Sequence, residues 1–289
     1  MIHAVPEMFK PKIRVEYPPD NKQIFEEWFY ENAYVQVQEP WIKRHYLPIF
    51  WTSFQVNNDY GKGRKMHDLQ AYIDGLDRSK KYFTITQYDD GPLVDFKDLD
   101  IKVFGSGGGR IDVPIPLVCM KHPGVTEYVP PSERKYIASF IGSITHPIRQ
   151  KMLDYLYTLS IERRKRYYIS TEHHDISRYC EIMSQSTFAL CPRGYGKTSF
   201  RICEAIQYKT IPVYISDEFI YPFNGPEDYY GLSVEESDIQ HIDIMLELYF
   251  KNSIKYWDQA TLKSLSAVDD LMYCYVGLSK AILGWLKHL

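Results

Sequence analysis

The sequence predicts an α/β protein with two Rossmann-like domains and a helical C-terminal tail. Its 289 residues are enough for two domains, each with a core of its own. The second half alternates strand-like and helix-like segments, as in a parallel sheet covered by helices, and the first half repeats this pattern less regularly. We place the boundary between residues 125 and 126, inside the proline-rich segment 121–134.

The second half has the clearest succession of elements. Runs of β-branched and aromatic residues predict its strands, and Pro147 marks the first turn of a helix. The last three elements fit the length of one βαβ unit. In order, the prediction is strand 136–141, a helix from Pro147, strand 166–170, helix 175–186, strand 187–191, helix 199–209 and strand 210–216.

The first half predicts a helix over 67–76 and strands over 81–88 and 99–105. From Asp238 to Leu289 the chain is expected to be helical. In a protein with two domains, such a tail can pack back onto the rest of the chain.

The composition excludes several classes of partner. The formal charge is only -3, so bulk electrostatics favours neither nucleic acid nor an anionic membrane. Twenty-five tyrosines supply flat apolar faces with a polar tip, which suit stacking on sugars as well as core packing. No apolar run predicts a secretion signal or membrane insertion, so we expect a cytoplasmic protein. The five cysteines are expected to be reduced: Cys119, Cys180, Cys191, Cys203 and Cys274.

The segment from Cys191 to Phe223 is the most informative part of the chain. A strand ends at Cys191, and a glycine-containing loop leads to a helix capped by Thr198 or Ser199. Backbone N–H groups and the helix dipole favour an anion there, and Arg193 and Arg201 would add positive charge. Glu204 lies one turn after Arg201 and can accept hydrogen bonds from a ribose diol. The alternative is a surface Arg–Glu pair.

Two glycine-rich stretches resemble nucleotide-binding motifs but depart from them. GYGKTS resembles the end of a P-loop, yet Cys191 stands where the first glycine is required. GSGGGR over 105–110 resembles a dinucleotide fingerprint, but Arg110 replaces its last glycine and the following residues predict extended chain. We therefore expect this stretch to be a flexible loop that touches an acceptor.

The segment from Cys191 to Phe223 also resembles the signature of the exostosin-like family, glycosyltransferase family 47. The upstream FIGSITHPIRQ is similar to another family motif, and KYFTITQYDDG resembles the family's acidic strand in the N-terminal domain. The matching residues are Cys191-Pro192-Arg193-Gly194, Ser199-Phe200-Arg201, Glu204-Ala205, Ile211-Pro212-Val213, Ser216-Asp217, Pro222-Phe223, Gly142, Ser143 and Arg149.

This resemblance implies a GT-B fold, with two Rossmann-like domains facing a central cleft. Residues 1–125 would bind the acceptor, an oligosaccharide or glycoprotein, and residues 126–289 a UDP-sugar. Transfer would invert the configuration at the anomeric carbon and would need no metal or other cofactor. Cellular members carry an N-terminal Golgi anchor that this sequence does not show, unless it has been removed. Shortened members similar to this chain are encoded by large DNA viruses of algae, which implies capsid glycans and the host cytoplasm.

Inverting transfer requires a base for the acceptor hydroxyl and positive charge for the leaving diphosphate. Asp89 and Asp90 follow a strand, where functional groups gather in α/β sheets, and are our candidates for the base. Asp74 and Asp112 are alternatives, and a plain turn at Asp89–Gly91 stays open. The expected donor site comprises Gly142, Ser143, Arg149, Arg193, Gly194, Thr198, Ser199, Arg201 and Glu204; Asn57, Asn58 and Tyr60 are expected to contact the acceptor.

Other hypotheses remain open at this point. Asp98-Leu99-Asp100 has the letters of a metal-binding DxD, but three letters are weak support. A phosphotransferase would require ATP and magnesium, and a carbohydrate-binding protein would bind glycan without a nucleotide. Xylose is our first candidate for the sugar. The acceptor linkage and the oligomeric state have no signal in the sequence.

Overall fold

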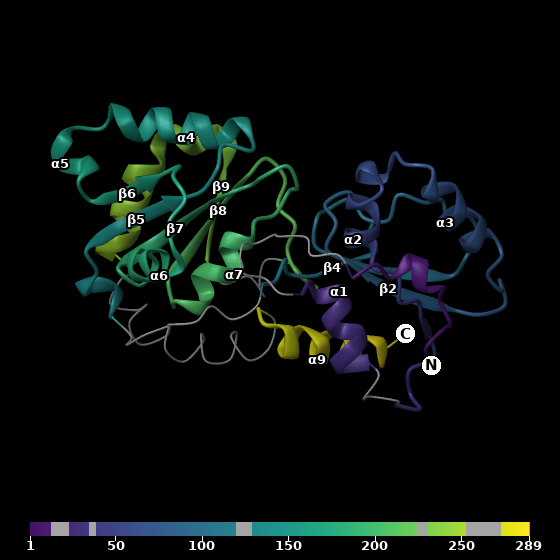
Figure 1. The fold of residues 1–289 in the computed structure, drawn as a ribbon. Helices are drawn as coiled ribbons and strands as arrows, with labels where there is room; N and C mark the ends of the chain where they lie inside the picture. The colour runs from purple at the N-terminus through teal and green to yellow at the C-terminus, as the bar shows by residue number, and fades with distance from the viewer. Residues whose placement is uncertain are drawn as a thin grey trace. The chain divides into compact units, whose positions relative to one another are not determined.

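A computed structural model describes residues 1–12, 23–34, 39–119, 129–223, 225, 231–252 and 273–288 (Figure 1). The chain forms two compact units. Unit 1 comprises Met1–Met120, Ile220–Asp228 and Cys274–Leu289, and unit 2 comprises Lys121–Phe219 and Tyr229–Tyr273. The final helix therefore belongs to unit 1, and not to the second domain as the sequence analysis expects. The expected boundary and most of the proline-rich segment lie outside the described residues.

The sheet of unit 1 is parallel, with strand order β1-β2-β3-β4. Strand β2 is buried along its whole length, because a parallel sheet is covered on both faces. Residues Tyr82 to Thr86 pair in register with Ile101 to Gly105. The strands are β1 His45–Tyr46, β2 Tyr82–Thr86, β3 Ile101–Gly105 and β4 Val113–Pro114.

The helices of unit 1 precede β1, lie between β1 and β2, or follow β4 along the chain. Trp51, Leu69 and Ile73 anchor α2 and α3 in an apolar core with β2. Trp285 of α9 packs edge-on against Phe104 of β3, with ring centroids 5.2 Å apart. The elements are η1 Glu7–Phe9, α1 Phe25–Trp28, the π-helical turn η2 Phe29–Tyr34, α2 Trp51–Val56, η3 Asp59–Gly61, α3 Lys65–Asp74 and α9 Tyr275–Leu286.

The sheet of unit 2 is also parallel, with strand order β6-β5-β7-β8-β9. From β5 the chain first moves to β6 on one side, and it then crosses to β7, β8 and β9 on the other. The direction in which the chain adds strands therefore reverses between β5 and β7. Ligands bind at such a switch point in open α/β sheets. The strands are β5 Tyr136–Ile141, β6 Tyr167–Ser170, β7 Ser186–Pro192, β8 Ile211–Ser216 and β9 Leu232–Glu235.

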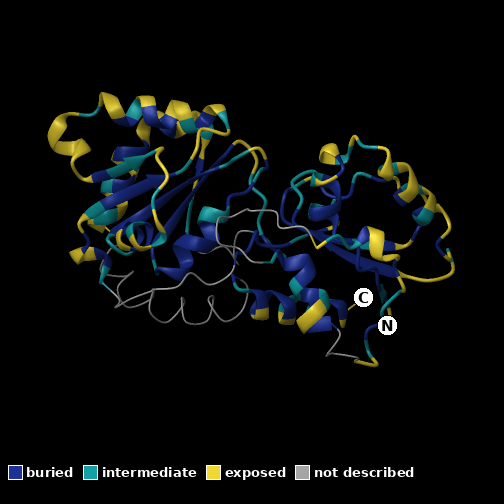
Figure 2. Ribbon diagram, viewed as in Figure 1, coloured by how far each residue is buried: buried dark blue, intermediate teal, exposed yellow. Residues whose placement is uncertain are grey.

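Helices cover this second sheet and bury its strands (Figure 2). Ile148, Met152 and Leu156 of α4 enter the same apolar core as Phe188 and Val213 of the sheet. The helices are η4 Pro131–Glu133, α4 Pro147–Thr158, α5 Ile161–Arg164, α6 Ile176–Ser184, α7 Phe200–Gln207 and η6 Glu236–His241, followed by helical residues 242–252.

The predicted α/β class, with parallel sheets and a C-terminal helix, is confirmed. Strand 136–141 coincides with β5, and the other strands and helices predicted in the second half differ from the observed ones by a few residues at most. The tail is helical over 242–252 and in α9, and the segment between them lies outside the described residues.

Candidate functional site

The expected donor residues gather at the switch point of unit 2, where β5 and β7 end. Loop 142–146 follows β5, and loop 193–199 follows β7. A Cβ on Gly194 would lie 3.3 Å from Arg149 Nη2 and 3.4 Å from Thr145 Oγ1, so the two loops are in contact. The structure thus brings together residues that lie about fifty positions apart in the sequence.

Arg149 of α4 joins the two loops through their backbone. Its guanidinium donates to the carbonyl oxygens of Ser143 at 2.8 Å, Arg193 at 3.0 Å and Pro192 at 3.2 Å. Hydrogen bonds from a charged donor are stronger than neutral ones. Arg149 therefore fixes the shape of the site, and its direct contact with a donor stays a prediction.

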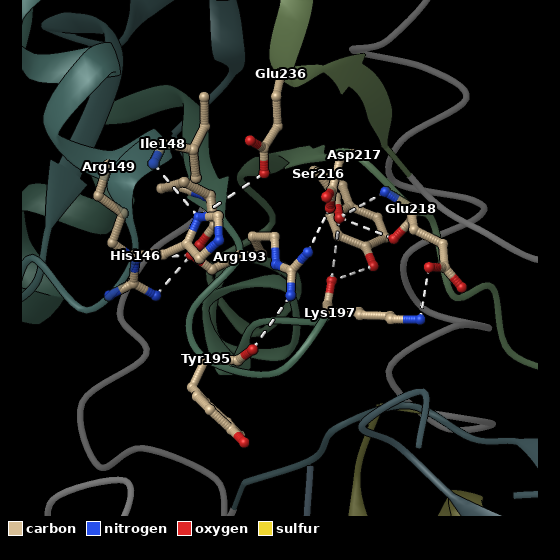
Figure 3. A network of polar contacts seen from close by, with 12 residues as sticks. His146, Ile148, Arg149, Arg193, Tyr195, Lys197, Ser216, Asp217, Glu218 and Glu236 are labelled. Atoms are coloured by element: carbon tan, nitrogen blue, oxygen red, sulfur yellow. Dashed lines mark hydrogen bonds and ion pairs between the residues drawn. The ribbon is translucent and has the colours of Figure 1, made fainter. Parts of the chain in front are cut away.

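Arg193 connects this site to the loop after β8 (Figure 3). Its guanidinium forms an ion pair with Asp217 and donates to the carbonyl oxygen of Tyr195 at 3.2 Å. The hydrogen bond from Arg193 holds the pKa of Asp217 below its usual value. Asp217 was part of the recognised motif, but the sequence analysis gave it no role in the site.

The N-terminus of α7 points toward the same edge of the sheet. Ser199 is its N-cap, and its hydroxyl accepts a hydrogen bond from Arg201 N at 3.3 Å. Thr198 precedes the cap and is buried. The first amides of a helix lack partners within the helix and favour an anion. Lys197 forms an ion pair with Glu218 at 2.5 Å in the loop that sequence analysis rejected as a P-loop.

Glu204 and Arg201 form a buried pair rather than the surface pair considered as the alternative. Their side chains are only 10% and 15% exposed, with 3.2 Å between Arg201 Nε and Glu204 Oε2. Tyr179 donates to the same carboxylate at 2.7 Å, and the Arg201 guanidinium lies 5.1 Å from the Tyr179 ring centroid. Arg201 also donates to the carbonyl oxygen of Ile141, where β5 ends. The role of Glu204 as a ribose ligand stays a prediction.

A histidine and a glutamate complete this edge of the sheet. His146 is the N-cap of α4, and its Nδ1 accepts a hydrogen bond from Ile148 N at 3.3 Å, which places the imidazole proton on Nε2. Glu236 Oε1 lies 3.8 Å from the same Nδ1 (Figure 3). No sequence motif indicates Glu236, because it lies far from His146 along the chain.

In unit 1, Asp89 and Asp90 lie in a turn directly after β2. Loop 105–110, which follows the neighbouring strand β3, packs against this turn backbone to backbone. A Cβ on Gly107 would come within 2.2 Å of Asp89 Cα, and one on Gly109 within 2.2 Å of the Asp90 carbonyl carbon. Arg110 N donates to the Asp90 carbonyl oxygen at 3.1 Å. Close packing on the turn therefore accounts for these glycines, whereas the sequence analysis expected a flexible loop.

The three residues expected to contact an acceptor lie together around η3. Asn57 donates to the carbonyl oxygen of Ser53 at 2.6 Å, and the buried Asn58 donates to that of Gly63 at 3.4 Å. Tyr60 is 63% exposed and has a positive φ of 50°. The two asparagines thus shape this turn, and contact with an acceptor stays a prediction for all three residues.

The remaining acidic candidates of unit 1 hold other parts of the fold. Asp74 accepts from Lys97 at 2.9 Å, and this hydrogen bond holds its pKa below the usual value. Asp112 accepts from Val103 N at 2.9 Å. Both carboxylates of the DxD letters face arginines: Asp98 is 3.4 Å from Arg78, and Asp100 is 2.6 Å from Arg44.

Two features are absent from the described part of the chain. Within it, no group of three His, Cys, Asp or Glu side chains has the geometry to hold a metal ion. Nor does any helix there have both the length and the apolar composition required to cross a bilayer.

Comparison with known proteins identifies relatives for part of the chain. A probable glucuronosyltransferase of Oryza sativa subsp. japonica is 41% identical over 80 residues, 27% of this chain and 18% of the relative. The probable β-1,4-xylosyltransferase IRX10L of Arabidopsis thaliana is 39% identical over 80 residues, 27% of this chain and 19% of the relative. A probable glycosyltransferase of the same plant is 30% identical over 142 residues, 47% of this chain and 27% of the relative. The chain thus matches less than a third of the length of each.

Among solved structures, TarM aligns with 75% of this chain and 52% of its own, at a TM-score of 0.42 and 11% identity. The fold assignment rests on the two parallel sheets rather than on this similarity. The Exostosin GT47 domain matches residues 102–247, just over half of the chain, and this region includes both loops of the switch point. The chain therefore belongs to the exostosin GT47 family of glycosyltransferases.

Proposed function

We propose that the chain is an inverting glycosyltransferase that moves a sugar from UDP to a hydroxyl group of a glycan acceptor. One observation carries this proposal: at the switch point of unit 2, loops 142–146 and 193–199 are in contact, and arginines hold both of them. Cationic side chains and a helix N-terminus at the carboxyl edge of a parallel sheet suit a diphosphate.

In the proposed reaction, Arg193, Arg201 and the first amides of α7 stabilise the charge that develops on the leaving UDP. Positive charge fixed in advance lowers the barrier, because little reorganisation is needed when the bond breaks. This chemistry requires no metal. Glu204 would accept hydrogen bonds from the ribose, and for this its carboxylate must face both Arg201 and the nucleotide.

Asp89 or Asp90 would take the proton of the acceptor hydroxyl while that oxygen attacks the anomeric carbon. A carboxylate at the end of a strand, on a turn fixed by its neighbours, suits a base that must be held in place. Asn57, Asn58 and Tyr60 are the proposed acceptor contacts.

The proposal also names candidates for the transferred sugar and for the acceptor. Xylose is the first candidate, and the names of relatives that transfer xylose and glucuronic acid support a test of both. A capsid glycan as acceptor and a cytoplasmic location rest on the resemblance to viral members alone.

A thermal-unfolding panel tests the donor class. We expect UDP and one UDP-sugar, each at a hundred times its Kd, to raise the free energy of unfolding by about 2.7 kcal/mol. The panel includes UDP-xylose, UDP-glucuronic acid, UDP-glucose, GDP, and ATP with magnesium. Hydrolysis of the best-bound UDP-sugar would then show the reaction.

Two variants of unit 2 make the panel specific. Arg193→Gln should raise the Kd for UDP at least tenfold. Arg166→Gln is the control, because it removes an ion pair with Glu247 at the start of β6, and it should leave the Kd for UDP unchanged. A response to ATP with magnesium alone would indicate a phosphotransferase. Binding of glycan without any nucleotide effect would indicate a carbohydrate-binding protein, and either outcome would overturn the proposal.

A further inference from the structure

We propose that Glu26 and Gln55, two buried side chains of unit 1 outside the expected site, are the positioning residues of the Asp89–Asp90 turn. The role in catalysis rests on the proposed function, since Asp89 or Asp90 is the proposed base. The contacts that hold the turn do not depend on that function.

Glu26 of α1 fixes the beginning of the turn. Its carboxylate accepts from the backbone N–H of Gln87 at 2.7 Å, from Thr52 Oγ1 at 2.6 Å and from Thr52 N at 3.0 Å. The residue is 0% exposed, and no ion pair joins it to a basic group among the residues described. The carboxylate thus links α1, the N-terminus of α2 and the residue that follows β2.

A buried carboxylate without a cation is costly, because hydrogen bonds only partly replace its hydration. Burial accordingly raises the pKa of Glu26 to about 7. The titratable groups that act on it are Glu27 of the same helix and Tyr46 of β1, and neither supplies positive charge. Burial disfavours a charged carboxylate at this position, so its presence needs another explanation. The three donors that surround it indicate that it aligns the backbone after β2 with α2.

Gln55 of α2 fixes the end of the turn. Its amide nitrogen donates to the carbonyl oxygen of Gly91 at 3.1 Å, and its amide oxygen accepts from Leu93 N at 2.7 Å. The side chain is 0% exposed. Glu26 bonds the first residues of α2, and Gln55 extends from the same helix, so one short helix connects both ends of segment 87–93.

Loop 105–110 bounds this segment on a third side, through Gly107 and Gly109. Three separate parts of unit 1 therefore fix the backbone of a single turn that carries two aspartates. A plain connecting turn needs no such support, whereas a catalytic carboxylate must be held within a fraction of an ångström.

Hydrogen exchange in the full chain tests the positioning directly. At pH 8, amides within 87–93 should exchange at least tenfold faster in Glu26→Gln and in Gln55→Met. Glu26→Gln replaces the charged acceptor of the Gln87 N–H with a weaker neutral one, and Gln55→Met removes the hydrogen bonds to Gly91 and Leu93. Glu31→Gln is the matched control, since Glu31 is exposed on the adjoining turn and contacts Lys12 and Gln23 instead. Unchanged exchange in both test variants would overturn the proposal.

Transfer kinetics test the catalytic consequence. Both variants should lower kcat at least tenfold while the KM for the UDP-sugar changes less than twofold, since the proposed donor site is in unit 2. Wild-type kcat should fall as the pH drops below 7, and this dependence should be absent in Glu26→Gln. Accelerated exchange with normal kcat would refute the positioning role. If no nucleotide sugar is used, the proposed function fails, and the exchange measurements still decide whether Glu26 and Gln55 hold the turn.

Discussion

The two units hold the loops at the ends of their strands in different ways. In unit 2, Arg149 and Arg201 reach across and bond the carbonyl oxygens of neighbouring loops. In unit 1, glycines allow direct backbone contact, and buried neutral or acidic side chains bond the turn. The first arrangement leaves positive charge beside the site, as an anionic donor requires. The second holds the turn that carries the proposed base, Asp89 or Asp90, through an amide, a carboxylate and close backbone contact.

This contrast predicts that the pH dependence of stability near neutrality arises in unit 1. The folded pKa of Glu26 lies above its unfolded value, so burial favours the protonated form and the wild type loses stability as pH rises from about 4.5 to about 7. Compared with Glu26→Gln, the wild type should lose on the order of 3 kcal/mol over this range. Chemical denaturation at pH 5 and pH 8 measures it. An equal pH response in both proteins would remove Glu26 from the comparison.

A second prediction concerns the glycine contacts. Gly107→Ala should destabilise unit 1 by roughly 1–3 kcal/mol, because its Cβ would meet the backbone of Asp89 and force a shift. Gly194→Ala in unit 2 should cost less than about 1 kcal/mol, because the atoms it would meet, Arg149 Nη2 and Thr145 Oγ1, belong to side chains that can move. Equal losses, measured by urea denaturation, would show that both units depend on glycine in the same way.

The third and smallest effect on stability is expected from Arg149→Lys. Lysine keeps the charge but cannot reach three carbonyl oxygens with one planar group, so roughly 1–2 kcal/mol should be lost. Affinity for UDP should fall as well, because the two loops would separate. Gln150→Ala is the control on the same helix, where the Gln150 side chain donates a hydrogen bond to Asp154. A lysine variant with normal UDP affinity would show that the hydrogen bonds of Arg149 to the two loops do not shape the site.

Sequence reasoning predicted β5 to β8, α4, α6 and α7 well, because each of these strands is a short apolar run and the helices have clear starting residues. It missed much of the first sixty residues, where α1, η2 and α2 are short and aromatic residues serve helices and core alike. It also missed β9, whose burial pattern alternates and whose four residues include Ser233 and Glu235.

The candidate site was partly predictable for a related reason. Arg193, Ser199 and Arg201 lie close together in sequence, so the loop and the helix cap could be inferred from local chemistry. Contacts such as Arg149 with Pro192, or Glu236 with His146, depend on which strands are neighbours. Glu26 had no signal, because only the fold reveals that it is buried against Gln87 and Thr52.

The position of α9 in unit 1 has a consequence for how the protein is made. Domains generally fold as units during synthesis, starting from the N-terminus. Here the first unit lacks α9, and with it the contact of Trp285 with Phe104, until residues 275–286 have been translated. The second unit ends earlier in the chain, so it can complete its fold first, and the order of folding would be the reverse of the order of translation.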